Sequence, residues 1–212
     1  MGSARGRRAE RLPKAAIRAQ ARGLPVRTDG READTPLLFG RVLDGQGGGR
    51  PILWDEARQW RPGAPGEVLW LHLCRNRPGV QDWLENALSI PEPTAELLTS
   101  DETRPRAFRE GEALVATLRG INFNPGAEPE DMISMQVWSD GERLITLRRH
   151  PLQTPRDVLA QVDRGHGPPD AGATITLLAE LLIGRMSQSI VDMNRVLDTL
   201  EETDPDEMAE SM

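Results

Sequence analysis

The feature that most constrains the fold is a long run of helical periodicity near the C-terminus. Between about Ala171 and Glu202, apolar residues recur every three or four positions, which is the spacing of one face of an α-helix. They are Ile175, Leu178, Leu182, Met186, Ile190, Met193, Leu197 and Leu200. Such a helix is long for a compact domain, and its apolar face continues to the acidic C-terminal end, where little of the domain is left to cover it. We therefore expect this face to pack on something outside the chain.

Strand patterns dominate the rest of the chain. Two strands joined by a glycine-rich turn form a predicted hairpin, and a third, nearly all apolar, is expected mid-sheet because it has the pattern of a strand buried on both faces. A further strand and a second hairpin follow, and Asp140-Gly141 suits a type I′ turn because glycine tolerates positive φ. The predicted strands cover residues 36–44, 50–54, 67–74, 112–123, 132–139 and 143–149.

Helices are predicted over residues 77–88, 91–102 and 154–165, besides the long C-terminal one. Thr94 and Thr154 are the candidate N-caps of the second and third, since a threonine hydroxyl can accept a bond from an unpaired amide in the first turn. The resulting order is β-β-β-α-α-β-β-β-β-α-α, which places four strands after the second helix, one more than the three ranges assigned there. This order predicts an α/β protein with a mixed, largely antiparallel sheet flanked by helices.

Pro105 marks the joint between the second helix and the strands that follow. A proline disfavours the α region for the preceding residue, here Arg104, and it has no amide hydrogen to donate within a helix. The helix must therefore stop before Pro105 and the chain must leave it extended. We expect the neighbouring guanidiniums of this joint to pair with nearby acids or carbonyls; a contact between subunits or a regulatory contact is the alternative.

Charge and composition exclude several classes of protein. The net charge of −7 hides a basic arm, because residues 1–34 carry nine Arg or Lys against four acids. This arm has no apolar periodicity, which predicts a flexible tail; loose contact with acidic lipid or nucleic acid is the alternative. Because the arm also has no aromatics and the rest of the chain is acidic, we expect no dedicated nucleic-acid binding. The single cysteine, Cys74, excludes an intramolecular disulfide and favours a reducing compartment. The longest apolar run, 173–183, is shorter than the ~20 residues of a membrane span, so we expect no spanning segment.

No sequence motif points to catalysis, and we expect a protein that is not an enzyme. The motifs G-x-S-x-G, H-E-x-x-H, C-x-x-C and G-x-G-x-x-G are all missing from the sequence. His72 and Cys74 lie two residues apart on one predicted strand, so their side chains share a face. They are weak candidates for a metal contact, because a zinc site needs three or four ligands. A buried core histidine beside an inert buried cysteine is the alternative.

Four segments, in this order and spacing, resemble the cytoplasmic domain of the CorA-type metal-ion transporters, and the ZntB branch in particular. They are "FGRVLDGQGG", "LWLHL", "SDETRPR" and "GPPDAGATITLLAELLIGRMSQSI". The most specific stretch contains Glu102, Arg104, Pro105 and Arg106, which the resemblance implies to be a structural family signature. The resemblance implies an αβα sandwich, with residues 35–170 as a cytoplasmic funnel domain and residues 171–212 leading towards a stalk.

The same resemblance implies a homopentamer on the cytoplasmic side of the inner membrane, with two membrane helices per subunit and a Gly-Met-Asn pore motif. This chain has no such motif, its nearest string being Asp192-Met193-Asn194. We therefore expect a soluble portion of a longer transporter for divalent cations, Zn²⁺ first among them. It would contribute assembly, a negative funnel potential and cation sensing, and it would meet the membrane through later helices. The alternative is a freestanding soluble module whose acidic helix docks a partner.

Overall fold

The structure is a computed structural model that describes residues 35–127 and 132–203. The chain divides into two units, Met1–Asp34 and Thr35–Met212. The predicted basic arm and the acidic C-terminal end, residues 204–212, lie outside the described residues. The description below concerns the second unit.

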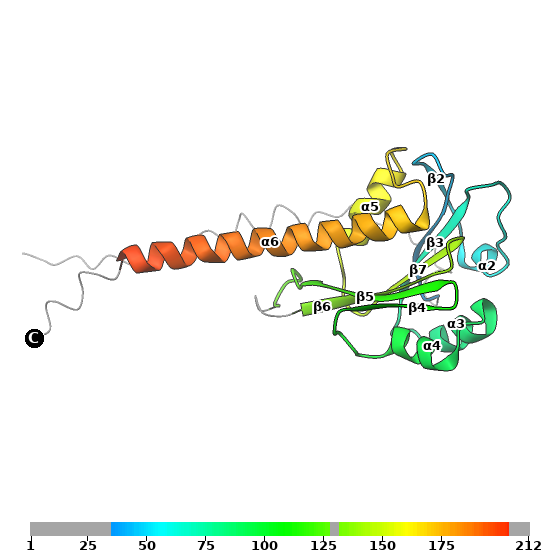
Figure 1. Ribbon diagram of the computed structural model, residues 1–212, viewed down its shortest axis with the longest axis horizontal. Helices are drawn as coiled ribbons and strands as arrows, with labels where there is room; N and C mark the ends of the chain where they lie inside the picture. The colour runs from blue at the N-terminus through cyan, green and yellow to red at the C-terminus, as the bar shows by residue number, and fades with distance from the viewer. Residues whose placement is uncertain (1–34, 128–131, 204–212) are drawn as a thin grey trace, which may run out of the picture. The chain divides into compact units, whose positions relative to one another are not determined.

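A seven-stranded sheet forms the centre of this unit, in the order β2-β1-β3-β7-β6-β5-β4 (Figure 1). β3 pairs with β7 in parallel and all other neighbours are antiparallel, which confirms the predicted mixed, largely antiparallel sheet. β3 lies inside the sheet as predicted, because it is apolar on both faces. The strands are β1 (Leu37–Leu43), β2 (Gly49–Pro51), β3 (Val68–Cys74), β4 (Arg106–Glu110), β5 (Ala113–Ile121), β6 (Met132–Ser139) and β7 (Arg143–Arg148).

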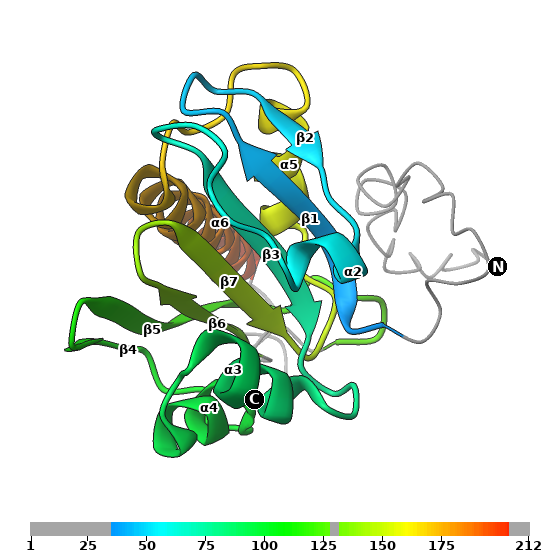
Figure 2. The same ribbon diagram turned by 90° about the vertical axis from the view of Figure 1, so that its right-hand side faces the viewer.

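Helices cover both faces of the sheet (Figures 1 and 2). α3 (Val80–Leu88) and α4 (Glu92–Thr99) close one core around Leu71, and α5 (Thr154–Val162) and α6 (Ala171–Thr203) close the other around Trp70. Leu71 and Trp70 are successive residues of β3, so they point to opposite faces. The predicted order of elements is confirmed, and a short helix α2 (Trp54–Ala57) is added where the second predicted strand was expected to end.

Both predicted N-caps are wrong. Thr94 lies inside α4, after Pro91, and its hydroxyl donates to Glu110 Oε1 at 2.7 Å, so it links α4 to β4 instead. Thr154 is the first residue of α5, and the amides of Arg156 and Asp157 donate to the carbonyl of Gln153 rather than to its hydroxyl. In both cases a backbone carbonyl just before the helix already takes the first amides.

The β6–β7 hairpin is confirmed, but its predicted turn type is wrong. The Asp140 amide donates to the Arg143 carbonyl at 3.3 Å, so Gly141 and Glu142 are the central residues. Gly141 has a positive φ of 96°, but Glu142 does not, because Ser89 is the one non-glycine residue with positive φ in the part of the chain described. A type I′ turn needs positive φ at both central positions. The Asp140 carboxylate accepts the Glu142 and Arg143 amides instead and fixes the turn.

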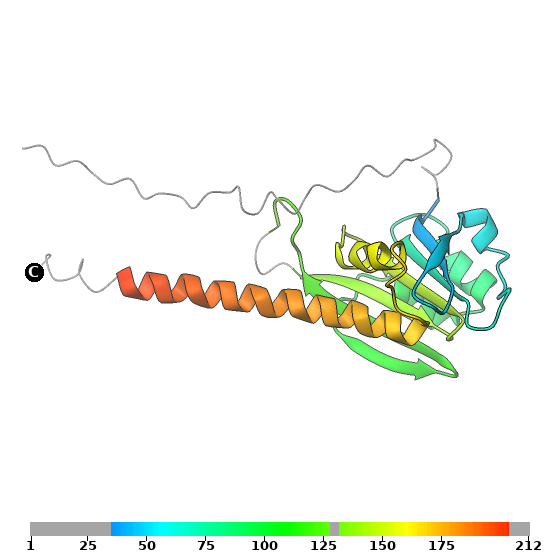
Figure 3. The same cartoon turned by 90° about the horizontal axis from the view of Figure 1, so that it is seen from above.

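The first turns of α6 pack on the sheet, and the remainder of the helix continues past it (Figure 3). Leu178 and Leu182 are buried, and Gly120 of β5 leaves room for Leu182, because a Cβ at Gly120 would lie 2.8 Å from the leucine Cδ2. We expected no segment long and apolar enough to cross a membrane. By length and mean hydropathy alone this is wrong, because the stretch Ala171–Thr199 of α6 is both long enough and apolar enough. Its packed first turns are nevertheless part of a protein core.

Candidate functional site

The joint around Pro105 is closed by the carboxylate of Glu102. α4 ends at Thr99 and β4 begins at Arg106, as Pro105 predicts. Between them, Glu102 Oε1 accepts the Arg104 amide at 2.9 Å, and Oε2 forms an ion pair with the Arg106 guanidinium at 3.2 Å. The Arg104 amide, and after it the Arg106 charge, hold the pKa of Glu102 below its usual range. Glu102 and Arg106 are thus brought together, while Arg104 contributes its backbone.

The same loop is tied to the carboxyl ends of the two parallel strands by Asp101. Its Oδ1 lies 3.1 Å from a guanidinium nitrogen of Arg75, which follows β3, and 2.5 Å from a guanidinium nitrogen of Arg149, which follows β7. Arg75 also donates to the Ser100 carbonyl, and it is only 6% exposed. Burial lowers the pKa of Arg75, and the bond from Arg149 lowers that of Asp101.

Gln136 anchors the joint to the middle of the sheet. It is fully buried on β6, and its Nε2 donates to the Glu102 carbonyl at 3.0 Å. The signature loop therefore touches residues on or just after three strands, which fits the predicted structural joint held by acids and carbonyls. Sequence reasoning missed Arg75, Asp101, Gln136 and Arg149. Arg75 could have been found in the sequence, because it directly follows an apolar strand. No sequence pattern indicates that Gln136 contacts the loop.

His72 and Cys74 lie on one face of β3, as predicted; His72 is buried in a hydrogen-bonded core, whereas Cys74 is half-buried at the end of the strand. His72 Nδ1 lies 2.9 Å from Thr146 Oγ1, which also accepts from Trp70 Nε1 and donates to the Leu71 carbonyl. This geometry is satisfied when the ring carries its proton on Nδ1. Burial, and then the charges of Arg148 and Arg156, lower the pKa of His72 to about 3. No group of three or more His, Cys, Asp or Glu within residues 35–127 and 132–203 could hold a metal ion, so the metal contact stays a prediction.

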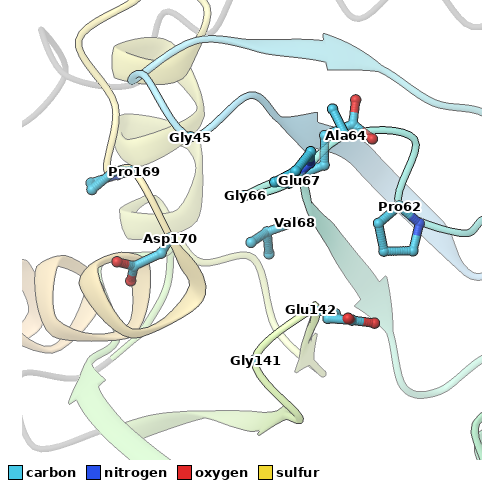
Figure 4. Close-up of a pocket in the computed structure, with 11 residues that line it drawn as sticks. Gly45, Pro62, Ala64, Gly66, Glu67, Val68, Gly141, Glu142, Pro169 and Asp170 are labelled. Carbon is cyan, nitrogen blue, oxygen red and sulfur yellow. The ribbon is translucent and has the colours of Figure 1, made fainter.

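A pocket of about 430 Å³ lies at the start of α6, among glycine- and proline-rich loops (Figure 4). Glu67, Glu142 and Asp170 line it. Two of these carboxylates are already engaged, because Glu67 Oε2 accepts the Gly63 amide and Asp170 Oδ1 accepts the Ala173 amide, each at 2.7 Å. Figure 4 shows the carboxylates of Asp170 and Glu142 pointing away from each other. The pocket offers no convergent set of ligands.

The exposed half of α6 carries an apolar seam. Ile183, Ile190 and Leu197 follow one another at seven-residue steps, with Met186 and Met193 between them. Ile183, Ile190, Met193 and Leu197 are between 49% and 62% exposed. Apolar residues repeating with this period are the a and d positions of a helix that packs against other helices. The expectation that the helix leaves an uncovered apolar face within its own subunit is confirmed.

A family model for the CorA-like Mg²⁺ transporter protein matches residues 65–211, which include the joint and the whole of α6. The chain belongs to the CorA-like transporter family. The predicted family is therefore confirmed.

Two curated relatives of this CorA-like chain are named as metal-ion transporters. The Divalent cation transporter CmaX of Pseudomonas aeruginosa is 40% identical over 167 residues, covering 78% of this chain and 50% of that protein. The Zinc transport protein ZntB of Pectobacterium atrosepticum is 32% identical over 161 residues, covering 76% and 47%. The chain thus spans about half the length of the curated relatives it matches.

Solved structures agree with this assignment. The structure of the full-length CmaX protein matches with a TM-score of 0.75 and 39% identity, covering 79% of this chain and 51% of that one. The ZntB cytoplasmic domain from Vibrio parahaemolyticus matches with a TM-score of 0.67 at 23% identity, covering 80% and 66%. The second likeness supports the fold, and it confirms the predicted sheet, flanking helices and long C-terminal helix.

Proposed function

We propose that this chain is the cytoplasmic head of a divalent-cation transporter of the inner membrane, that Zn²⁺ is its cargo and that five copies assemble through α6. Family membership and the names of the relatives support the transport role. In this proposal, residues 35–170 form the wall of a funnel and residues 171–212 lead towards the stalk. The head positions and senses cations rather than performing catalysis.

The exposed seam of α6 is the observation that carries this proposal. A row of isoleucine, methionine and leucine side chains in water is unfavourable for a freestanding domain, because covering the exposed half of each would stabilise it by roughly 1 kcal/mol. Further copies of the same chain carry the same seam with the same spacing. Helices from several copies can therefore cover one another around a common axis.

Transport is tested on the full-length gene product in liposomes that enclose a zinc-sensitive dye. We expect Zn²⁺ influx that saturates with concentration, and parallel dyes for Mg²⁺ and Co²⁺ define the cargo. Empty liposomes are the control. Absence of influx for every divalent cation would contradict the proposal. Recovery of the native product from the soluble fraction of the cell would instead favour the partner-binding module with a docking helix.

Assembly is tested with two variants that each add one carboxylate to α6. Ile190→Glu places it on the seam, whereas Gln188→Glu places it on an exposed position off the seam. We expect light scattering of the detergent-solubilised full-length product to show a pentamer for the wild type and for Gln188→Glu, and smaller species for Ile190→Glu. Equal behaviour of the two variants would mean that the seam does not mediate assembly.

A further inference from the structure

We draw no further inference here: the strongest candidate, the side-chain cluster of Arg119 on β5 and Gln136 on β6 beside the joint, holds a buried Nε and a buried Oε1 that have no hydrogen-bond partner among the described residues, but nothing in the structure places these two atoms at one cavity or shows what would bind them.

Discussion

Replacing Gly120 by valine tests how firmly α6 is held on the sheet. A Cβ at this position would lie 2.8 Å from Leu182 Cδ2, so valine must displace a leucine that is only 3% exposed. Overpacking of this kind costs about 1–3 kcal/mol of the free energy of unfolding. Leu182→Ala alone should cost about 2–5 kcal/mol, because it leaves a cavity between α6 and β5.

The two changes should compensate each other, because valine fills the space that the shortened side chain vacates. We expect the double variant to be more stable than the sum of the single effects by at least about 1 kcal/mol. The assay is urea unfolding followed by circular dichroism, with Gly184→Val as control. A Cβ added at Gly184 would have no neighbouring atom within 4 Å, so Gly184→Val should change the free energy of unfolding by less than about 0.5 kcal/mol. Additive effects of Gly120→Val and Leu182→Ala would refute the packing argument.

Three further predictions concern the joint and the core. Arg75→Met should lower the free energy of unfolding by about 1–3 kcal/mol, since it removes a buried donor to Ser100 and Asp101, while the exposed Arg77→Met should change it by less than about 0.5 kcal/mol. Equal effects in urea unfolding would contradict this. The pKa values of Asp101 and Glu102 lie below their ordinary values of 3.8 and 4.5, so their stabilisation is present above those values and is lost as the pH falls. The drop in urea midpoint between about pH 6 and pH 3 should therefore be smaller in the Asp101→Asn/Glu102→Gln double variant. Because burial lowers the pKa of His72 to about 3, its ring should be neutral in ¹⁵N NMR at about pH 5, and a charged ring at that pH would contradict the assignment. In the unfolded chain the ring gains a proton near its ordinary pKa of 6.5, so the contribution of His72 to the free energy of unfolding should decrease as the pH falls from 6.5 towards 3.

Local patterns were sufficient for most of the fold. The apolar run of β3 predicted its place inside the sheet, and Pro105 predicted where α4 stops and an extended chain begins. The predictions that were wrong concern polar side chains that can form hydrogen bonds with several different partners. Thr94 and Thr154 have side chains typical of N-caps, but the backbone carbonyls of Pro91 and Gln153, just before the helices, accept the first amides instead.

Only part of the candidate site could be predicted from the sequence, for a similar reason. Glu102 and Arg106 are four residues apart, so their ion pair could be anticipated from the sequence. Arg75, Gln136 and Arg149 are separated from the joint by 26, 34 and 48 residues in the contacts they make with it. No local pattern specifies such partners, because strand order decides which distant residues become neighbours.

The sequence by itself determined the class of the fold, the family and the long seam of α6, since these follow from periodicity and from residues close together in the chain. Tertiary structure alone decided which half of that seam is covered and which arginines obtain a carboxylate. Leu178 and Leu182 belong to the same predicted apolar pattern as Ile190 and Leu197, yet they are buried because the sheet lies against the first turns of α6. Arg149 and Arg148 are adjacent, yet only Arg149 meets Asp101, because alternate strand residues point to opposite faces.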